Sequence, residues 1–206
     1  MSDVRAIFFD VGGVLLTNGW DRFSRREACR HFDLDWEDFQ DRHEFVADAF
    51  ERGEMTLDTY LERTVFYRDR SFDRGAFVEF MRAQSQPKED SLAVLAELSG
   101  SGRYLLATLN NESRELNEYR IERFGLRDHF SMFLSSCYLG ARKPEPDIYR
   151  MAIDISQQSA EHCVFVDDRE LNLECAVLAG MTPVHFDDAA GLRAKLGGVG
   201  VDLEAV

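Results

Sequence analysis

The sequence is poor in positive charge. Its 206 residues contain 24 Lys and Arg against 38 Asp and Glu, which gives a formal net charge of -14. Nucleic acids and anionic membrane surfaces bind basic faces, so this balance argues against either as the main partner. No apolar run approaches the roughly 20 residues that a membrane helix needs, and the N-terminus lacks a signal-peptide pattern. We therefore expect a cytoplasmic protein that binds neither nucleic acid nor membrane.

Cysteine and lysine are also scarce. The four cysteines show no close pairing such as Cys-x-x-Cys, so free thiols in a reducing compartment are expected. Cys163 and Cys175 lie in apolar runs and are expected to be small core residues. Only three lysines, at positions 88, 143 and 195, occur beside 21 arginines. In a chain that nearly always uses arginine, a lysine beside other candidate site residues is a stronger candidate for a functional role.

The region 19–86 has helical periodicity and no strand signal. Asp35 has the character of an N-cap, and Thr56 and Asp73 begin two further helical patterns. After Asp35, apolar or aromatic positions recur at spacings of three and four, as on one face of a helix. These positions are Trp36, Phe39, His43, Val46 and Phe50. We interpret the region as an inserted helical domain.

The rest of the chain alternates between strand and helix patterns. Short apolar runs predict strands, and the segments between them have helical stripes. The expected strands are residues 4–9, 104–109, 130–134, 163–166 and 182–186. This alternation predicts an α/β fold with a doubly wound parallel sheet. Its core would comprise residues 1–18 and 87–206, with the helical domain inserted after the first strand.

Polar residues follow the strands of this predicted sheet. Taken singly, each has an ordinary explanation as a turn residue, a helix cap or a solvated loop charge. The carboxyl ends of parallel strands meet at one edge, however, and ligands bind there. Three carboxylates in one crevice would repel one another unless a lysine and a divalent cation compensate them, and all-oxygen ligands suit Mg²⁺. The residues concerned are Asp10, Asn110, Asn111, Lys143, Asp167 and Asp168.

Four segments together resemble the motifs of the haloacid dehalogenase (HAD)-like hydrolase superfamily. They are Phe8 to Leu15, Leu109 to Asn111, Arg142 to Pro144 and Val164 to Asp168. The resemblance is strongest to the branch with a helical cap, which includes an α-D-glucose-1-phosphatase-like group and the phosphatase domain of soluble epoxide hydrolase. It implies a Rossmann-like core, a cap domain, and Mg²⁺-dependent hydrolysis of a small phosphorylated metabolite, with a sugar phosphate as one option.

The resemblance also implies a metal site. Asp10 would be both the nucleophile that forms an aspartyl-phosphate and a ligand of Mg²⁺. The backbone carbonyl of Gly12 and the side chain of Asp168 would be further ligands. Asp167 would act through water or from the next layer, and Asn172 would hold a metal-bound water.

A second set of implied roles concerns the phosphate. Lys143 would neutralise the charge of Asp10 and of the phosphate, and Asn110 or Asn111 would bind phosphate oxygens beside Gly12. A Ser or Thr is usual where Asn110 stands. Asn110 is the preferred residue for this role, and Thr108, which faces the same side two residues earlier, is the alternative.

Gly12 is the main departure from the family pattern. Phosphatases of the superfamily typically carry an aspartate there, which protonates the leaving oxygen and later activates water. The glucose-1-phosphatase-like group has a similar Asp-x-Gly start, and an activated leaving group such as an anomeric phosphate needs less protonation. His43 could donate a proton from the cap, although its aromatic stripe favours a core position. Gly12→Asp is expected to raise activity unless another acid is already present.

Two other functions compete with the phosphatase. A metal-independent 2-haloacid dehalogenase also uses an aspartyl ester, but such enzymes usually place tyrosine where Gly12 stands. A degenerate member of the superfamily would bind a phosphate or a partner without turnover. The sequence indicates neither the substrate nor the oligomeric state.

Overall fold

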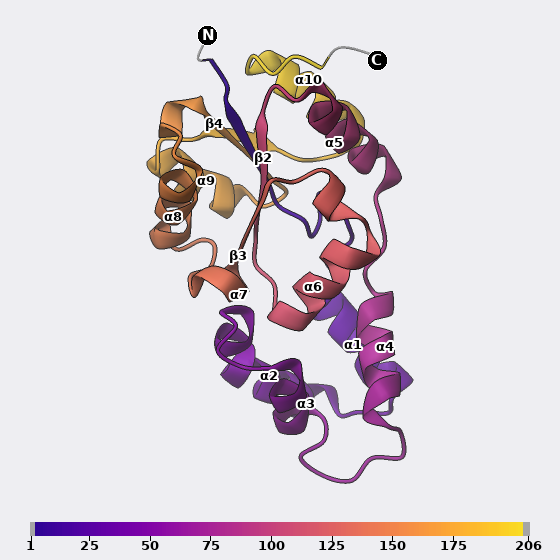
Figure 1. Cartoon of the computed structure of the whole chain (residues 1–206). Helices are drawn as coiled ribbons and strands as arrows, with labels where there is room; N and C mark the ends of the chain where they lie inside the picture. The colour runs from indigo at the N-terminus through magenta and orange to yellow at the C-terminus, as the bar shows by residue number, and fades with distance from the viewer. Residues whose placement is uncertain (1–2, 204–206) are drawn as a thin grey trace.

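A computed structural model describes residues 3–203, which form a five-stranded, entirely parallel sheet in the order β3-β2-β1-β4-β5 (Figure 1). The strands are β1 (Ala6–Phe9), β2 (Leu105–Asn110), β3 (Met132–Ser135), β4 (Cys163–Asp167) and β5 (Thr182–His185). Each lies within two residues of a predicted strand at both ends. The predicted α/β fold with a parallel sheet is therefore confirmed.

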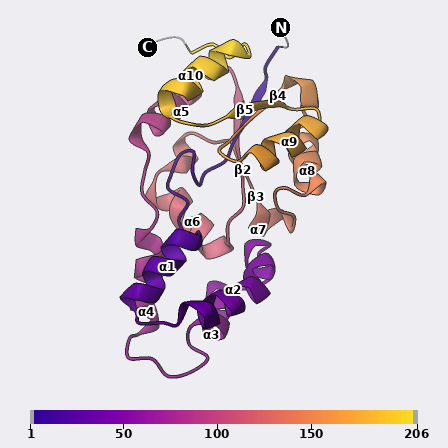
Figure 2. The same ribbon diagram turned by 180° about the vertical axis from the view of Figure 1, so that it is seen from behind.

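Helices cover both faces of the sheet, as Figures 1 and 2 show from opposite sides. The core helices are α5 (Glu89–Ser101), α6 (Arg114–Arg123), α7 (Ser136–Leu139), α8 (Pro146–Ser156), α9 (Glu170–Leu178) and α10 (Ala189–Gly198). Two single helical turns, η1 (Leu126–Asp128) and η2 (Ala160–His162), precede β3 and β4. No helix among residues 3–203 is both long enough and apolar enough to cross a membrane.

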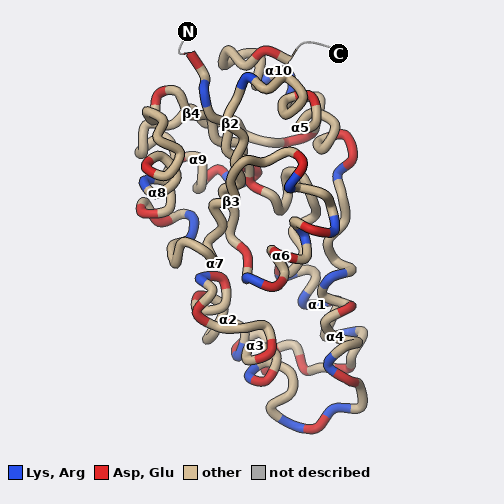
Figure 3. The backbone as a smooth tube through the Cα atoms, in the orientation of Figure 1, with Lys and Arg blue, Asp and Glu red and all other residues tan. Residues whose placement is uncertain are grey.

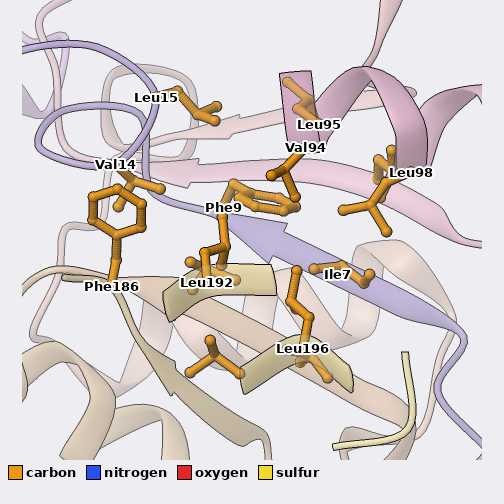
Figure 4. Close-up of a cluster of buried hydrophobic side chains, with 14 of the residues drawn as sticks. Ile7, Phe9, Val14, Leu15, Val94, Leu95, Leu98, Phe186, Leu192 and Leu196 are labelled. Carbon is orange, nitrogen blue, oxygen red and sulfur yellow. The ribbon is translucent and has the colours of Figure 1, made fainter. Parts of the chain in front are cut away.

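The central strand β1 is buried on both faces because its side chains alternate between two hydrophobic clusters. Ile7 and Phe9 pack with α5 and α10, in the cluster drawn in Figure 4. Ala6 and Phe8 point the other way and pack with residues of α8 and α9. All four are fully buried. This double burial fixes the position of the residue that follows the strand.

Four helices are inserted between β1 and β2 and lie at the bottom of Figure 1. They are α1 (Arg22–His31), α2 (Trp36–Glu51), α3 (Leu57–Thr64) and α4 (Arg74–Ala83). Asp35, Thr56 and Asp73 cap α2, α3 and α4 through side-chain oxygens, as predicted. The helices enclose their own aromatic cluster around Phe77 and Tyr60. The exact limits 19–86 of this insertion remain a prediction.

The two linkers to the insertion are bonded to each other. The N–H of Thr17 donates to the carbonyl of Gln86 at 2.9 Å, and the N–H of Gln86 donates to the Thr17 hydroxyl at 2.9 Å. Arg120 of α6 is buried beneath them. It donates to the Thr17 carbonyl at 2.6 Å and to the Ser85 hydroxyl at 2.9 Å. The core therefore holds both ends of the insertion at one point.

The structure differs from the sequence prediction in some helices. The sequence pattern predicted neither the short helix α7 nor the terminal helix α10, and it did not distinguish α1 as a separate helix. Helix α5 continues through Gly100. Gly102 ends the helix instead, in the left-handed conformation with φ 61°.

Candidate active site

The carboxyl ends of β1, β2 and β4 meet at the edge of the sheet that faces the inserted helices. β1 lies between β2 and β4, and the direction of winding changes there, so the crevice is at the topological switch point of the sheet. Asp10 follows β1, while Asn110 and Asp167 are the last residues of β2 and β4. Strand pairing thus brings together residues that are far apart in the sequence.

Lys143 joins the carboxylates of Asp10 and Asp167. Its Nζ lies 3.0 Å from Asp10 Oδ1 and 2.6 Å from Asp167 Oδ2, with the lysine side chain 2% exposed. Burial opposes the lysine charge, but the two carboxylates outweigh it and raise the pKa of Lys143. Burial also raises the pKa of Asp10, to about 6, although Lys143 acts against this shift. The lysine therefore keeps an anionic Asp10 possible in a buried place.

Asp10 has one oxygen held by the protein. Its Oδ1 accepts a hydrogen bond from the backbone N–H of Val11 at 2.8 Å as well as the contact from Lys143. Its Oδ2 makes no hydrogen bond within residues 3–203, and Asp10 lines the cleft described below. One carboxylate oxygen is thus fixed, while the other is available to a ligand.

The Asp167 carboxylate is buried and is fixed by several hydrogen bonds. It accepts from Lys143, from the backbone N–H of Arg169 at 2.8 Å, and from the Asn172 amide at 3.0 Å to each oxygen. Tyr149 in turn donates to the Asn172 carbonyl at 2.9 Å. These contacts use both oxygens of Asp167, whose side chain is fully buried. The geometry suits a residue that orients Lys143.

Asp168 is different because one of its oxygens is buried without a partner. Its Oδ1 has no hydrogen bond among the described residues. Burial, with Asp167 next in importance, raises the pKa of its carboxyl. Oxygens of Asp10, Asp167 and Asp168 all lie within 4.8 Å of one another. An orphaned oxygen in such a cluster fits a divalent cation, which would satisfy it and relieve the repulsion.

Gly13 makes this arrangement of Asp168 possible. Its φ is +82°, a conformation that favours glycine, and a Cβ at this position would come within 2.2 Å of Asp168 Oδ2. The glycine pair after β1 therefore lets the β4 carboxylate approach the β1 loop.

The two asparagines after β2 have different surroundings. Asn111 lines the cleft, and its side chain exchanges two hydrogen bonds of 2.8 Å with the backbone of Lys143. Asn110 is 1% exposed, donates to Asn117 at 3.0 Å, accepts from Ser135 at 2.8 Å, and does not line the cleft. Thr108 is also buried, and its hydroxyl has no partner among residues 3–203. The structure thus brings Asn111, but not Asn110 or Thr108, to the cleft wall.

A cleft of about 470 Å³ lies between the sheet edge and the inserted helices. Core residues, including Asp10, Gly12, Lys143 and Asn172, form one side, and residues of α1 and α2 form the other. Acidic residues are spread over the whole chain in Figure 3, yet the cleft is lined by six cationic and four acidic side chains. The cationic ones are Arg22, Arg25, Arg120, Arg142, Lys143 and Arg169. An anionic ligand is therefore favoured locally in a strongly acidic protein.

His43 is buried in the insertion and also lines the cleft. Its Nδ1 is 2.9 Å from the Tyr60 hydroxyl, which accepts from Trp20 Nε1 at 2.9 Å. Burial, with help from Arg25, lowers the pKa of His43 to about 3. The imidazole is therefore neutral near pH 7 and is a poor source of a proton.

The cleft also contains residues that the sequence did not single out. Glu51 from α2 and Glu112 from the loop after β2 both line it, and burial raises the pKa of each carboxyl. Arg142 lies 2.9 Å from Glu51, and Arg120 lies 3.1 Å from Glu112. Glu112 directly follows the Asn-Asn pair at the strand end, which is a signal that could have identified it.

Several known proteins are similar to this chain. The chain is 26% identical over 162 residues to flavin mononucleotide hydrolase 1 of Arabidopsis thaliana, covering 79% of this chain and 65% of that protein. It is 33% identical over 127 residues to phosphoserine phosphatase of Thermus thermophilus, covering 61% of this chain and 49% of that protein. The matched segments thus span less than two thirds of either relative.

A similar structure is that of a HAD family enzyme from Bacteroides thetaiotaomicron, solved in complex with magnesium and inorganic phosphate. It has a TM-score of 0.74 at 19% identity and covers 90% of this chain and 95% of its own. A sequence model of haloacid dehalogenase-like hydrolases matches residues 4–180, and the chain belongs to this family.

Proposed function

We propose that this protein is a Mg²⁺-dependent phosphatase that hydrolyses a small phosphorylated metabolite through an aspartyl-phosphate on Asp10. The observation that carries the proposal is the state of Asp10. Its Oδ1 is held by Lys143 at 3.0 Å and by a backbone N–H, its Oδ2 is unpaired within the described residues, and the residue lines a cleft rich in cations. This is the environment that an anionic nucleophile for a phosphate ester needs.

The metal site of the proposal uses Asp10, the carbonyl of Gly12 and Asp168. The orphaned oxygen of Asp168 supports a ligand role for that residue. Asp167 and Asn172 would support the site from behind, because the Asn172 amide is already bonded to Asp167. When bound, Mg²⁺ would supply positive charge for the phosphate oxygens and allow Asp10 to be ionised.

The residues of the chain then perform a two-step displacement. An Asp10 oxygen attacks phosphorus, and the bond to the ester oxygen breaks, leaving an aspartyl-phosphate and the alcohol. Lys143 stabilises the charge on the nucleophile and on the transferred group from its fixed place between Asp10 and Asp167. Asn111 acts on the same step by fixing the Lys143 backbone. Water attack on phosphorus then releases phosphate and restores Asp10.

The inserted helices form the second wall of the cleft and would select the substrate. Their contribution includes Arg22, Arg25, His43 and Phe50, a mixture of cationic, hydrogen-bonding and aromatic groups. A phosphorylated metabolite with a polar leaving group, such as a sugar phosphate, fits this lining. The phosphatase proposal is also supported by the relatives, which include a flavin mononucleotide hydrolase and a phosphoserine phosphatase. Such metabolites and Mg²⁺ are abundant in the cytoplasm, the location we propose.

The test is release of p-nitrophenol from p-nitrophenyl phosphate with and without Mg²⁺, followed by a panel of phosphorylated metabolites. We expect turnover that EDTA abolishes and Mg²⁺ restores. Asp10→Asn keeps the size of the side chain but removes the nucleophile, so it should abolish turnover while the circular dichroism spectrum stays native. Halide release from a 2-haloacid without metal would instead support a dehalogenase. Absence of turnover across the whole panel would leave a binding protein.

A further inference from the structure

We propose that Glu112 is the proton donor and acceptor that position 12 lacks. The proposal rests on the phosphatase function, and concerns how the leaving oxygen is protonated and the attacking water deprotonated. Gly12 and Glu112 line the same cleft, although they belong to the loops after different strands, β1 and β2. The loop after the neighbouring strand β2 thus supplies the carboxyl group that position 12 lacks.

The geometry that supports this assignment runs through one nitrogen of Arg120. A Cβ placed on Gly12 would lie 3.6 Å from Arg120 Nη1, so an aspartate at position 12 would extend into the space beside this nitrogen. The same Nη1 lies 3.1 Å from Glu112 Oε2. One guanidinium nitrogen therefore lies close both to the Glu112 carboxyl and to the space that an aspartate at position 12 would enter.

Glu112 is held firmly for a side chain in a loop. Its Oε1 accepts the N–H of Ser113 at 2.9 Å, and its own N–H donates to the Ser136 hydroxyl at 3.0 Å. The side chain is 10% exposed, and that of Arg120 is 3% exposed. Arg120 is itself fixed by the linker residues Thr17 and Ser85. A carboxyl fixed in this way is preorganised for proton transfer.

On balance, the surroundings of Glu112 favour its protonated form. Burial favours the protonated form, Arg120 opposes it, and the nearby Glu51 favours it again; the pKa of Glu112 is raised as a result. The other candidates are less suitable. His43 is neutral, with a pKa of about 3, and Glu51 belongs to helix α2 of the insertion and not to the core.

The proton balance of the reaction is then complete. In the first step the bond between phosphorus and the ester oxygen breaks, and its electron pair goes to that oxygen, which takes the Glu112 proton and leaves as the alcohol. In the second step the Glu112 carboxylate accepts a proton from water as the water oxygen attacks phosphorus. The bond to Asp10 breaks, the electron pair returns to the Asp10 carboxylate, and Glu112 is again protonated.

The experiment compares two leaving groups in Glu112→Gln. p-Nitrophenolate leaves without a proton, whereas the alkoxide of a simple alkyl phosphate does not. We expect kcat/KM for the alkyl ester to fall by about 100- to 10,000-fold, the usual value of general acid–base help, with a change of less than about 10-fold for p-nitrophenyl phosphate. In the double variant Gly12→Asp/Glu112→Gln, the alkyl-ester activity should return. Gly12→Asp alone should give no gain.

The control is Glu51→Gln, which removes the other cleft glutamate. It should leave the ratio of the two activities unchanged, whatever its effect on each. An equal loss on both substrates in Glu112→Gln, or no loss on either, would overturn the proposal. If Glu112→Gln fails to fold, Glu112→Asp, which keeps the charge but shortens the reach, must show the same selective loss. No turnover of p-nitrophenyl phosphate by the wild type would refute the phosphatase function itself, and this proposal with it.

Discussion

The side chain of Asn111 and the backbone of Lys143 hydrogen bond to each other in both directions. Lys143 N–H donates to Asn111 Oδ1, and Asn111 Nδ2 donates to the Lys143 carbonyl, each at 2.8 Å. The Asn111 amide thus pairs with the Lys143 backbone as a neighbouring strand would. It links the loop that carries Lys143 to the end of β2. Because Lys143 then reaches Asp10 and Asp167, the position of its ammonium group depends on the Asn111 side chain.

Asn111→Leu, which keeps the shape but removes both hydrogen bonds, should displace Lys143. With a net value of about 1 kcal/mol for each bond, the free energy of unfolding should fall by about 2 kcal/mol in urea titrations. A small displacement of a catalytic group can lower the rate on the order of 100-fold, so kcat/KM should fall by up to this amount. The loss should be similar for all phosphate esters, since in the proposed mechanism Lys143 acts on the phosphate that they share. A loss confined to some esters would contradict this reasoning.

Lys143→Met should destabilise the fold because it leaves two carboxylates buried without their cation. Removal of one partner of a buried ion pair costs about 3–5 kcal/mol, and the Lys143 and Asp167 side chains are 2% and 0% exposed. In Lys143→Met/Asp167→Asn, one of the two charges is also removed, so part of the stability should return. Urea unfolding of the two single variants and the double variant measures this coupling. Additive losses would show that the pair is energetically independent.

Gly13→Ala should weaken Mg²⁺ binding. The new methyl group would lie only 2.2 Å from Asp168 Oδ2, and would push away the carboxylate with the orphaned oxygen. We expect the Mg²⁺ concentration for half-maximal activity to rise at least about 10-fold, equivalent to about 1.4 kcal/mol. Gly102→Ala is the control, since Gly102 also has a positive φ, of 61°, but has no atom within 4 Å of the added Cβ. It should lose stability through backbone strain and keep the Mg²⁺ dependence of the wild type.

His43 should make the fold sensitive to acid. Its pKa is about 3 in the folded protein, against about 6.5 in an unfolded chain, so below pH 6.5 the unfolded state binds a proton that the folded state rejects. Stability should therefore fall as the pH decreases from 6.5 towards 3, by at most about 1.4 kcal/mol per pH unit from this residue. His43→Gln should reduce the slope by up to that amount in urea titrations. An NMR signal of the His43 ring that titrates near pH 6 would contradict the expectation.

Hydrophobic pattern was sufficient to locate all five strands, because β1 and its neighbours are buried runs with clear ends. The helices that were missed lack that signal. In α1 only Ala28 and Cys29 are buried, α7 is a single turn, and α10 contains three glycines that the packing of Leu192 and Leu196 overrides.

The strand ends also led to the expectation that Asp10 and Asp167 meet, which follows from the parallel pairing of β1 with β4, and the scarcity of lysine drew attention to Lys143. The sequence could not show that the Asn110 side chain is enclosed by Asn117 and Ser135 while Asn111 reaches the cleft. Nor could it show the contact of Glu112 with Arg120, because that pair forms only when α6 packs beneath the linkers. Side-chain direction and contacts of this kind depend on the folded environment.

The hydrogen bonds between Thr17 and Gln86 have a consequence for how such a protein can diversify. These bonds join the two linkers, so the chain leaves the core and returns to it at one place. The segment between Thr17 and Gln86 is therefore a module with a single fixed point of attachment. Its length adds little closure entropy, which grows only slowly with loop size. Gene rearrangement or protein engineering can therefore exchange the inserted helices while the core keeps Asp10 and Lys143 in place. Glu112, which is paired with Arg120 beneath the linkers, would remain with the core. It could then act in the proposed reaction with any inserted domain.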